Sequence, residues 1–461
     1  MLEVAFAPGA YNRSAMGIAQ ARLVNYYAEA TPFAPDARFP RPCLTSPSSV
    51  GSGPIRGLFI QPGVFGGELF VVSATTLYRA GASVGTIAGT DMVRFAASAT
   101  QLVIVANGSA YAYDGSTLTL IDDTDLPAVT DVVFIGGRFV FGLQNSSRFR
   151  WSDTSSATTV DGLAFSNAES SPDYIVGLAI ALGQLVIFGS TSVEFWDLTG
   201  NDDEPFQHAG SGTYLRGCVS RDAIVVADNS VFWIGDDRII YRGKSVPERV
   251  SNHGIEAALK SCTSLSSATA FEARVEGHAF LVVNVPGVTT FALDLAAPQA
   301  SDGWAEWSSY GRTTFRGRCS VMSSGDVLVG DEVAGNVYTL ASGVYSDNGD
   351  PVTFLASAFI KGANKAERCN NIVVQGARGV GLATGQGSDP ITELRFSDDQ
   401  GRSWSDWFQA SPGAVGQYKD RAVWQRMGLV REPGRVLEIR TTDPVLATLT
   451  GLLVNQERPY G

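Results

Sequence analysis

The sequence predicts an all-β protein: a β-propeller with an N-terminal extended arm and a C-terminal β-sandwich-like domain. Three observations lead to this fold class. Short hairpin cores recur along residues 54–346 without intervening helices, as the blades of a propeller do. Fifty glycines stand among many β-branched and aromatic residues, which is typical of strands joined by turns. The composition, 44% hydrophobic and 17% charged, is that of a globular protein.

The first segment, residues 1–53, differs from the rest. Six prolines interrupt it, and they flank the short apolar stretch that begins at Leu23. This pattern predicts an extended arm that packs on something else, either the body of its own chain or a neighbouring subunit. An ordinary N-terminal strand and loop is the alternative interpretation.

The propeller is predicted over residues 54–346. Each hairpin core consists of an apolar or β-branched run, a turn rich in Gly, Asn or Asp, and a second strand that carries an aromatic residue. The seven cores are Leu69–Tyr78, Leu102–Tyr113, Val132–Trp151, Leu185–Trp196, Ala223–Tyr241, Phe280–Leu293 and Val327–Tyr338. Propellers have no default phosphate-binding turn, so function is expected on surfaces.

One helix is predicted within the propeller, over residues 251–260. Ser251 would cap it, and Glu256 and Lys260 would form an i,i+4 ion pair. Such a short helix would cover an edge between two blades.

The last segment, residues 347–461, predicts a β-sandwich of about 110 residues, the size usual for that fold. Alternating strands are expected at 354–360, 371–374, 394–397, 421–429 and 437–441. A linker near residues 345–350 separates this domain from the propeller.

The net charge of −12 is concentrated in the propeller. Residues 54–350 carry 17 basic and 32 acidic side chains, whereas the two flanking segments are close to neutral. Grip on nucleic acid needs clusters of Lys and Arg that neutralise phosphates, which this balance does not favour. An acidic wall would instead repel DNA and let it slide past.

The sequence contains no strong signal for a metal, a cofactor or a membrane span. Its five cysteines are far apart without a Cys-x-x-Cys pair, which favours free buried thiols over a zinc site or disulfides. The longest uncharged stretch, residues 174–189, is shorter than the roughly 20 residues of a spanning helix. The start of the chain lacks the basic region of a secretory signal. No catalytic, cofactor-binding or metal-ligating residue is therefore assigned.

One motif allows an enzymatic alternative. Residues 397–404, Ser-Asp-Asp-Gln-Gly-Arg-Ser-Trp, fit the Asp-box of sialidase-type propellers. The Asp and Ser side chains of such a box bond to the amides of a tight hairpin, so the box marks a fold and not a catalytic centre. A carbohydrate-active or glycan-binding propeller, sialidase-like, is the rival hypothesis.

Four segments, in order along nearly the whole chain, carry a resemblance to a known family. They are residues 23–32 (LVNYYAEATP); 168–173 running into 187–200 (IFGSTSVEFWDLTG); the turn and helix 250–261; and 358–361 through Arg368 to 418–426 (YKDRAVWQR). Together they make the chain similar to the packaged-DNA stabilisation proteins of short-tailed bacteriophages, also called tail nozzle or tail hub proteins.

This resemblance implies a structural virion protein of the tail, assembled in the host cytoplasm, with no catalytic residues, no cofactor and no membrane insertion. Family members form a homo-oligomeric ring, a hexamer, below the portal and its adaptor ring. They close the channel with a needle or plug protein, carry a tail spike or fibre, retain packaged DNA, and conduct it during ejection without specific binding.

A closed ring needs two different contact patches on each subunit. Arg and Trp side chains often anchor protein interfaces, and the C-terminal domain places both on or near short strands. The candidate inter-subunit or adaptor contacts are therefore Lys361, Lys365, Arg368, Tyr418, Lys419, Arg421, Trp424 and Arg426.

Overall fold

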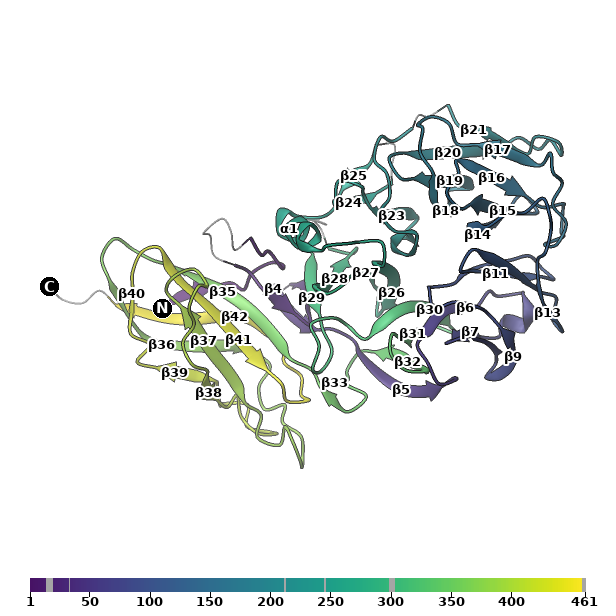
Figure 1. Ribbon diagram of the computed structural model, residues 1–461. Coiled ribbons are helices and arrows are strands. Elements are labelled where there is room, and N and C mark those ends of the chain that lie inside the picture. Colours follow the sequence, from purple (N-terminus) through teal and green to yellow (C-terminus); the bar gives the residue numbers. More distant parts are fainter. Residues whose placement is uncertain (14–19, 33, 211–212, 244–245, 298–302, 458–461) are drawn as a thin grey trace.

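The computed structural model describes residues 1–13, 20–32, 34–210, 213–243, 246–297 and 303–457. The molecule is elongated, with a β-propeller at one end and a β-sandwich at the other (Figure 1). This architecture confirms the predicted all-β fold class. Among the described residues, no helix has both the length and the apolar character required to cross a membrane.

The propeller consists of seven four-stranded units, which we call blades 1–7 in the order of their inner strands. Blade 1 contains β6 (Ile55–Phe59), β7 (Phe70–Ser73), β8 (Thr76–Arg79) and β9 (Ala82–Thr86). Blade 2 contains β10 (Arg94–Ala97), β11 (Leu102–Ala106), β12 (Ser109–Tyr113) and β13 (Leu118–Leu120). Blade 3 contains β14 (Val129–Ile135), β15 (Arg138–Leu143), β16 (Arg148–Trp151) and β17 (Phe165–Asn167). Blade 4 contains β18 (Ile175–Ala181), β19 (Gln184–Gly189), β20 (Val193–Leu198) and β21 (Phe206–His208).

The remaining blades follow the same antiparallel order from the axis outward. Blade 5 contains β22 (Val225–Ala227), β23 (Ser230–Ile234), β24 (Ile240–Arg242) and β25 (Glu248–Arg249). Blade 6 contains β26 (Thr269–Val275), β27 (His278–Val285), β28 (Thr289–Asp294) and β29 (Trp304–Trp307). Blade 7 contains β30 (Gly317–Ser323), β31 (Asp326–Asp331), β32 (Asn336–Ala341) and, as its outer strand, β5 (Cys43–Ser49).

Each of the seven predicted hairpin cores falls in a different blade, which confirms the prediction that each core marks one blade. The ring is closed by β5, whose residues pair with β32 far along the chain. A strand from before blade 1 thus completes the sheet of blade 7, and the closure depends on residues that the sequence assigned to the arm.

The sandwich has two sheets. The first contains β3 (Tyr26–Thr31), β4 (Ala34–Pro40), β42 (Leu449–Glu457), β36 (Glu367–Gly376) and β39 (Val423–Gln425), with β1 (Leu2–Val4) on β42 and β40 (Leu429–Val430) on β36. The second contains β2 (Leu23–Val24), β35 (Phe354–Lys361), β41 (Gly434–Thr441), β37 (Thr392–Ser397) and β38 (Phe408–Ala410). The strand expected at 421–429 is broken into β39 and β40, with Arg426 at a positive φ between them.

The two domains share one sheet. β2 pairs in parallel with β29 of blade 6 and antiparallel with β35 of the sandwich, which makes a nine-stranded sheet. A single hydrophobic cluster also spans the boundary, with Trp307 and Tyr338 on the propeller side and Leu394 and Val454 on the sandwich side. The N-terminal arm therefore packs on its own chain, and it joins the two domains.

A buried ion pair lies at this junction. Arg41, between β4 and β5, contacts Asp347 of the short strand β33 (Ser346–Asp347), with 2.7 Å between Nη2 and Oδ2. Both side chains are at most 2% exposed. Arg41 also donates to the Asn25 side chain and to the carbonyls of Pro42 and Ser308, so all five of its N–H groups have acceptors. A buried charge is tolerated here because it is fully paired.

Asn25, which separates β2 from β3, completes the junction. Its φ of 58° lies in the left-handed region, which Asn adopts more readily than most residues. Its carboxamide accepts from Arg41 and from the Ser308 amide, and donates to Ser308 Oγ and the Thr353 carbonyl. The side chain of one residue thus binds propeller, linker and arm together.

The predicted helix is present as α1 (His253–Ser261), but its details differ from the prediction. Asn252, not Ser251, is the cap, because its side chain accepts from the amides of Gly254 and Ile255. The expected ion pair with Lys260 does not form either. Glu256 is buried, and its carboxylate accepts instead from Arg249 and from Ser251. The helix packs between blades 5 and 6, as expected.

The remaining elements are two short 3₁₀ turns, η2 (Phe65–Gly67) and η3 (Arg221–Ala223), and β34 (Asp350–Pro351), which pairs with β33. All five cysteines are free thiols, as the sequence predicted.

We expect Asp347→Asn to lower the free energy of unfolding by about 3–5 kcal/mol, because the change leaves the Arg41 charge buried without its counter-ion. Urea unfolding followed by tryptophan fluorescence measures the effect. Asp202→Asn serves as control, since Asp202 is 96% exposed although it also pairs with an arginine, and its midpoint should not move. An unchanged midpoint in Asp347→Asn would contradict this role of the pair.

The same pair predicts a pH dependence. Burial raises the pKa of the Asp347 carboxyl, but the charge and hydrogen bonds of Arg41 outweigh it and leave that pKa below its usual value. A lowered pKa in the folded state gives stability that is present above the unfolded value of about 4 and is lost as the pH falls through the folded pKa. The stability difference between the wild type and Asp347→Asn should therefore be constant from pH 5 to 8 and shrink below about pH 4.

Candidate functional site

The propeller axis contains a cavity of about 710 Å³. All seven inner strands, or the residues beside them, contribute to its wall, which is mostly apolar. Gly57 permits the close approach of blades 1 and 2, because a Cβ there would meet Val93 and Phe95 at under 3 Å. The charged side chains of the wall are Arg94, Asp131, Asp222, Glu272 and Arg318.

One end of the axis is closed by arginines. Arg221, in η3 before blade 5, donates to the carbonyls of Met92 and Thr130, each at 2.7 Å. Arg94 of blade 2 donates to the Arg221 carbonyl at 3.1 Å and to the Asp131 carboxylate at 3.2 Å. Since blades 2 and 5 stand across the ring from each other, these bonds cross the axis. The cavity is therefore a blind pocket and not a channel.

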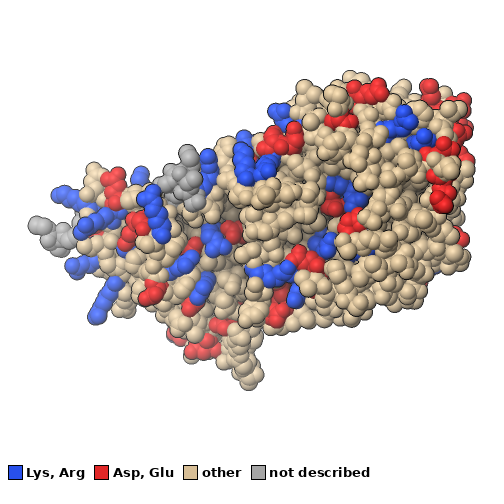
Figure 2. Space-filling model, in the orientation of Figure 1, with Lys and Arg blue, Asp and Glu red and all other residues tan. Residues whose placement is uncertain are grey.

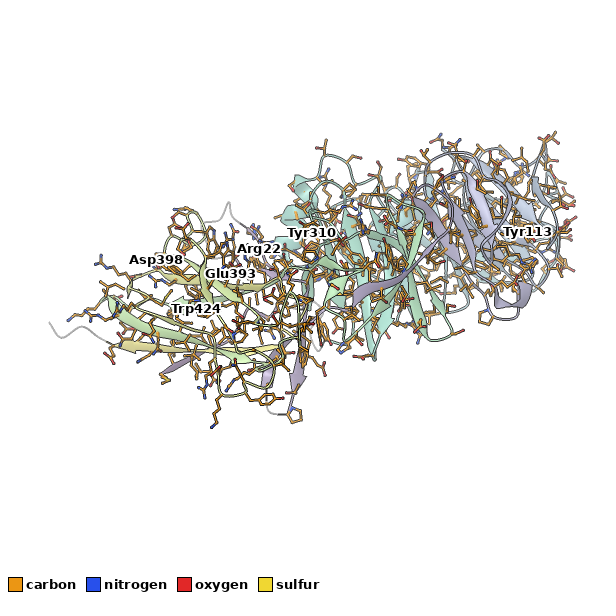
Figure 3. The ribbon with its side chains drawn as sticks, turned by 90° about the horizontal axis from the view of Figure 1, so that it is seen from below. Arg22, Tyr113, Tyr310, Glu393, Asp398 and Trp424 are labelled. Carbon is orange, nitrogen blue, oxygen red and sulfur yellow. The ribbon has the colours of Figure 1, made fainter. Side chains whose placement is uncertain are left out.

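A second cavity, of about 810 Å³, lies between the domains. Arg22 pairs there with Glu306 at 2.9 Å, and Arg395 donates to Glu438 at 2.7 Å. The Arg395 guanidinium also lies over Trp404, 4.3 Å from the ring centroid. Figure 3 places Arg22 at the boundary between propeller and sandwich. The Arg22–Glu306 pair ties the arm to blade 6 at the junction. Arg395 and Glu438 face each other on the adjacent sandwich strands β37 and β41.

The predicted contact residues divide into two groups and one buried side chain. Lys361, Lys365, Arg368 and Arg426 are exposed at one end of the sandwich. Lys361 ends β35 and Arg368 lies near the start of β36, while the Arg426 amide donates to the Asn370 carbonyl in the same strand. We call this region, together with the exposed Arg431, the basic end of the sandwich.

Tyr418, Lys419 and Arg421 are exposed in the loop between β38 and β39, and Tyr418 is 69% exposed. This loop packs near Gly379, just beyond the far end of β36. At about 3.3 Å per residue, the length of β36 separates it from Arg368 by roughly 25 Å. The eight residues therefore do not form a single patch.

Trp424 is only 4% exposed and lies among the strands of the sandwich (Figure 3). Its Nε1 donates to the Phe408 carbonyl at 2.8 Å, which satisfies its polar group inside the core. The prediction of Trp424 as a surface contact is corrected by this placement, and its position supports stability instead. One face of β39 is buried, and the alternation of residues in the sequence does not show which face that is.

Sequence reasoning also missed several surface residues. Phe359 and Leu429 are 41% and 42% exposed beside the basic end, and alternation with Lys361 could have identified Phe359. The arginines that close the propeller axis carry no motif, because only the closed ring brings blades 2 and 5 together.

The Asp-box is a local hairpin between β37 and β38. The Asp399 carboxylate accepts from the Ser403 hydroxyl, from the Arg402 and Ser403 amides and from Ser397, and these bonds lower the pKa of Asp399. Gly401, at φ 95°, allows the tight turn. The box lies in the sandwich and not in the propeller. No group of three or more His, Cys, Asp or Glu able to hold a metal occurs in the described part of the chain.

The charges of the two ends differ. Figure 2 shows Lys and Arg gathered over the sandwich and Asp and Glu along the far edge of the propeller. The acidic edge consists of exposed loop residues of blades 2–4: Asp114, Asp122, Asp125, Asp153, Asp161, Asp202, Asp203 and Glu204. We call this set the acidic edge. It lies at the opposite end of the molecule from the basic end.

Comparison with known proteins identifies relatives over nearly the whole chain. A family model described as "Bacteriophage P22 Gp10, beta-propeller" matches residues 8–345, and one described as "Bacteriophage P22 Gp10, beta-sandwich" matches residues 354–457. The tail hub protein gp10 of Salmonella phage P22 is 23% identical over 418 residues, which cover 84% of this chain and 85% of that protein.

Solved structures share only general similarity. The computationally designed Ika8 protein has a TM-score of 0.40 and 14% identity, covering 70% of this chain and 99% of its own. The Pan2 WD40 domain of Neurospora crassa has a TM-score of 0.39 and 10% identity, covering 66% and 98%.

Two substitutions separate core from surface among the predicted contacts. Trp424→Ala should lower the free energy of unfolding by about 3–5 kcal/mol, because it leaves a large cavity in the sandwich. Tyr418→Ala should leave it unchanged, since the side chain is exposed. Thermal and urea unfolding of both variants check this. A Trp424→Ala protein with wild-type stability would contradict the buried position.

Proposed function

The chain belongs to the Bacteriophage P22 Gp10 family, and we propose that it works as the structural tail hub of a phage virion. The observation that carries this proposal is that propeller and sandwich match the family separately and in the same order along the chain. The protein is a component of the virion tail that contributes to packaged-DNA stabilisation, and it is a structural protein rather than an enzyme.

The finer proposal concerns assembly. The chain forms a homo-oligomeric ring, a hexamer, below the portal and adaptor ring proteins, with a needle or plug protein and a tail spike or fibre attached. Its two ends support this arrangement, because a ring built from head-to-tail contacts needs two different patches on each subunit. The basic end and the acidic edge are different patches of opposite charge.

The basic end is proposed as one of these contacts. Lys361, Lys365, Arg368 and Arg426 supply positive charge, and the neighbouring Phe359 and Leu429 supply exposed apolar area. Interfaces commonly combine an apolar centre with a charged rim. Complementary charge also accelerates association and orients the partners.

The path of DNA is proposed to follow the lumen of the ring. The propeller axis is unsuitable, because Arg94 and Arg221 close one end of it. The acidic surface of the propeller supports passage without specific binding, since like charge keeps the phosphate backbone from adhering.

Charge reversal tests the basic end. We expect Lys361→Glu with Arg368→Glu to remain folded but to lose ring formation on a portal and adaptor preparation, as measured by mass photometry and negative-stain microscopy. The matched control is Lys260→Glu with Arg402→Glu, which reverses two exposed charges elsewhere and should assemble normally.

The outcomes separate the two levels of the proposal. If both double variants assemble like the wild type, the basic end is not a ring contact. If the wild-type protein itself forms no ring with portal and adaptor and is absent from purified virions, the tail hub assignment is wrong.

A further inference from the structure

The open end of the blind pocket in the propeller is lined by apolar side chains at equivalent positions of four blades. Phe134, Ile180, Val226 and Met322 occupy the same position in blades 3, 4, 5 and 7, one residue before the pair that closes each inner hairpin. All four line the pocket. Val226 and Met322 are 48% and 43% exposed, although they lie on inner strands. Four blades thus present apolar side chains to solvent at one opening.

The charges of the pocket are paired with one exception. Asp131 pairs with Arg94 at 3.2 Å and Asp222 with Arg221 at 3.0 Å. Glu272 pairs with Arg274 at 2.9 Å. Arg318 also lines the pocket, but within the described residues no carboxylate lies in ion-pair contact with it.

The Nε of Arg318 donates to the Met92 sulfur, a weak acceptor, at 2.8 Å. Within the described residues its terminal nitrogens have no hydrogen-bond acceptor, and its side chain is half-buried. A guanidinium in this setting favours a carboxylate that it can bind through two parallel hydrogen bonds.

We propose that this pocket binds a segment of a partner polypeptide, with a carboxylate of the segment on Arg318 and apolar side chains against the mouth. The cavity of about 710 Å³ lies within the range of pockets that hold ligands. The choice of a polypeptide rests on the proposed function, since a tail hub assembles with other tail proteins. Phosphate-rich nucleic acid is disfavoured by the apolar mouth.

The proposal separates two surfaces of the chain. The basic end would hold the subunit in its ring, whereas the axial pocket would hold another protein at the opposite domain. A partner with an acidic, apolar segment could then be attached to each copy without any change in the ring contacts.

A random heptapeptide library with free carboxyl termini tests the pocket on the purified wild-type protein. Selection should enrich apolar sequences that carry an acidic residue or use the terminal carboxylate. Isothermal titration should show that Arg318→Gln binds the selected peptides at least about tenfold more weakly than the wild type does, because the ionic contact is lost. Val226→Arg, which places a long charged chain at the mouth, should reduce affinity similarly.

The control is Leu163→Arg, which adds the same charge at an apolar residue that is 85% exposed in the loop before the outer strand β17, away from the pocket. It should bind the peptides like the wild type, and circular dichroism should confirm that all three variants are folded. Enrichment of no sequence, or equal binding by Arg318→Gln and Val226→Arg, would overturn the proposal.

A short single-stranded oligonucleotide that displaces the peptides would favour nucleic acid as the occupant instead, and would also overturn it. Peptide selection needs no ring and no virion. Its failure therefore leaves the tail hub assignment intact. Conversely, if the protein binds the peptides but is absent from virions, the pocket proposal stands and the tail hub assignment is wrong.

Discussion

The buried pair of Arg41 and Asp347 is the interaction on which the arrangement of the two domains depends. Arg41 stands between the hairpin that joins the sandwich and the strand that closes the propeller, and Asp347 stands where the chain leaves the propeller. Every N–H of the guanidinium has an acceptor, so the charge is stable only when arm, linker and blade 6 are all in place. The same group of contacts therefore fixes both the closure of the propeller ring by β5 and the orientation of the sandwich relative to the propeller.

A shared sheet extends this constraint along the molecule. Because β2 pairs with both β29 and β35, the sheet of blade 6 continues into the sandwich without a flexible hinge. The hydrophobic cluster that spans the boundary adds packing to the same junction. Separate domains joined by a linker would be expected to move relative to each other. Here the shared sheet instead joins the domains, and the basic end and the acidic edge lie at opposite ends of the molecule.

Sequence patterns predicted the local structure well and the long-range structure poorly, for a physical reason. The seven hairpin cores are local, since each strand pairs with the next, and all seven were found in separate blades. The role of β5 depends on pairing with β32, which no local pattern reports. Trp424 lies on a strand of three residues between Val423 and Gln425, which is too short for alternation to decide which way its side chain points. The arginines of the propeller axis meet only after the ring closes.

These long-range contacts also decide what the propeller can do. An axis crossed by Arg221 and Arg94 cannot serve as a conduit. The same closure turns the axis into a pocket that is closed at one end. Every other charged side chain of its wall is in an ion pair, whereas Arg318 has no carboxylate partner among the described residues. The proposed ring contact and the axial pocket then lie on different domains of the subunit. Under these two proposals, binding at the pocket need not disturb the ring contact, because the junction at Arg41 lies between the two domains.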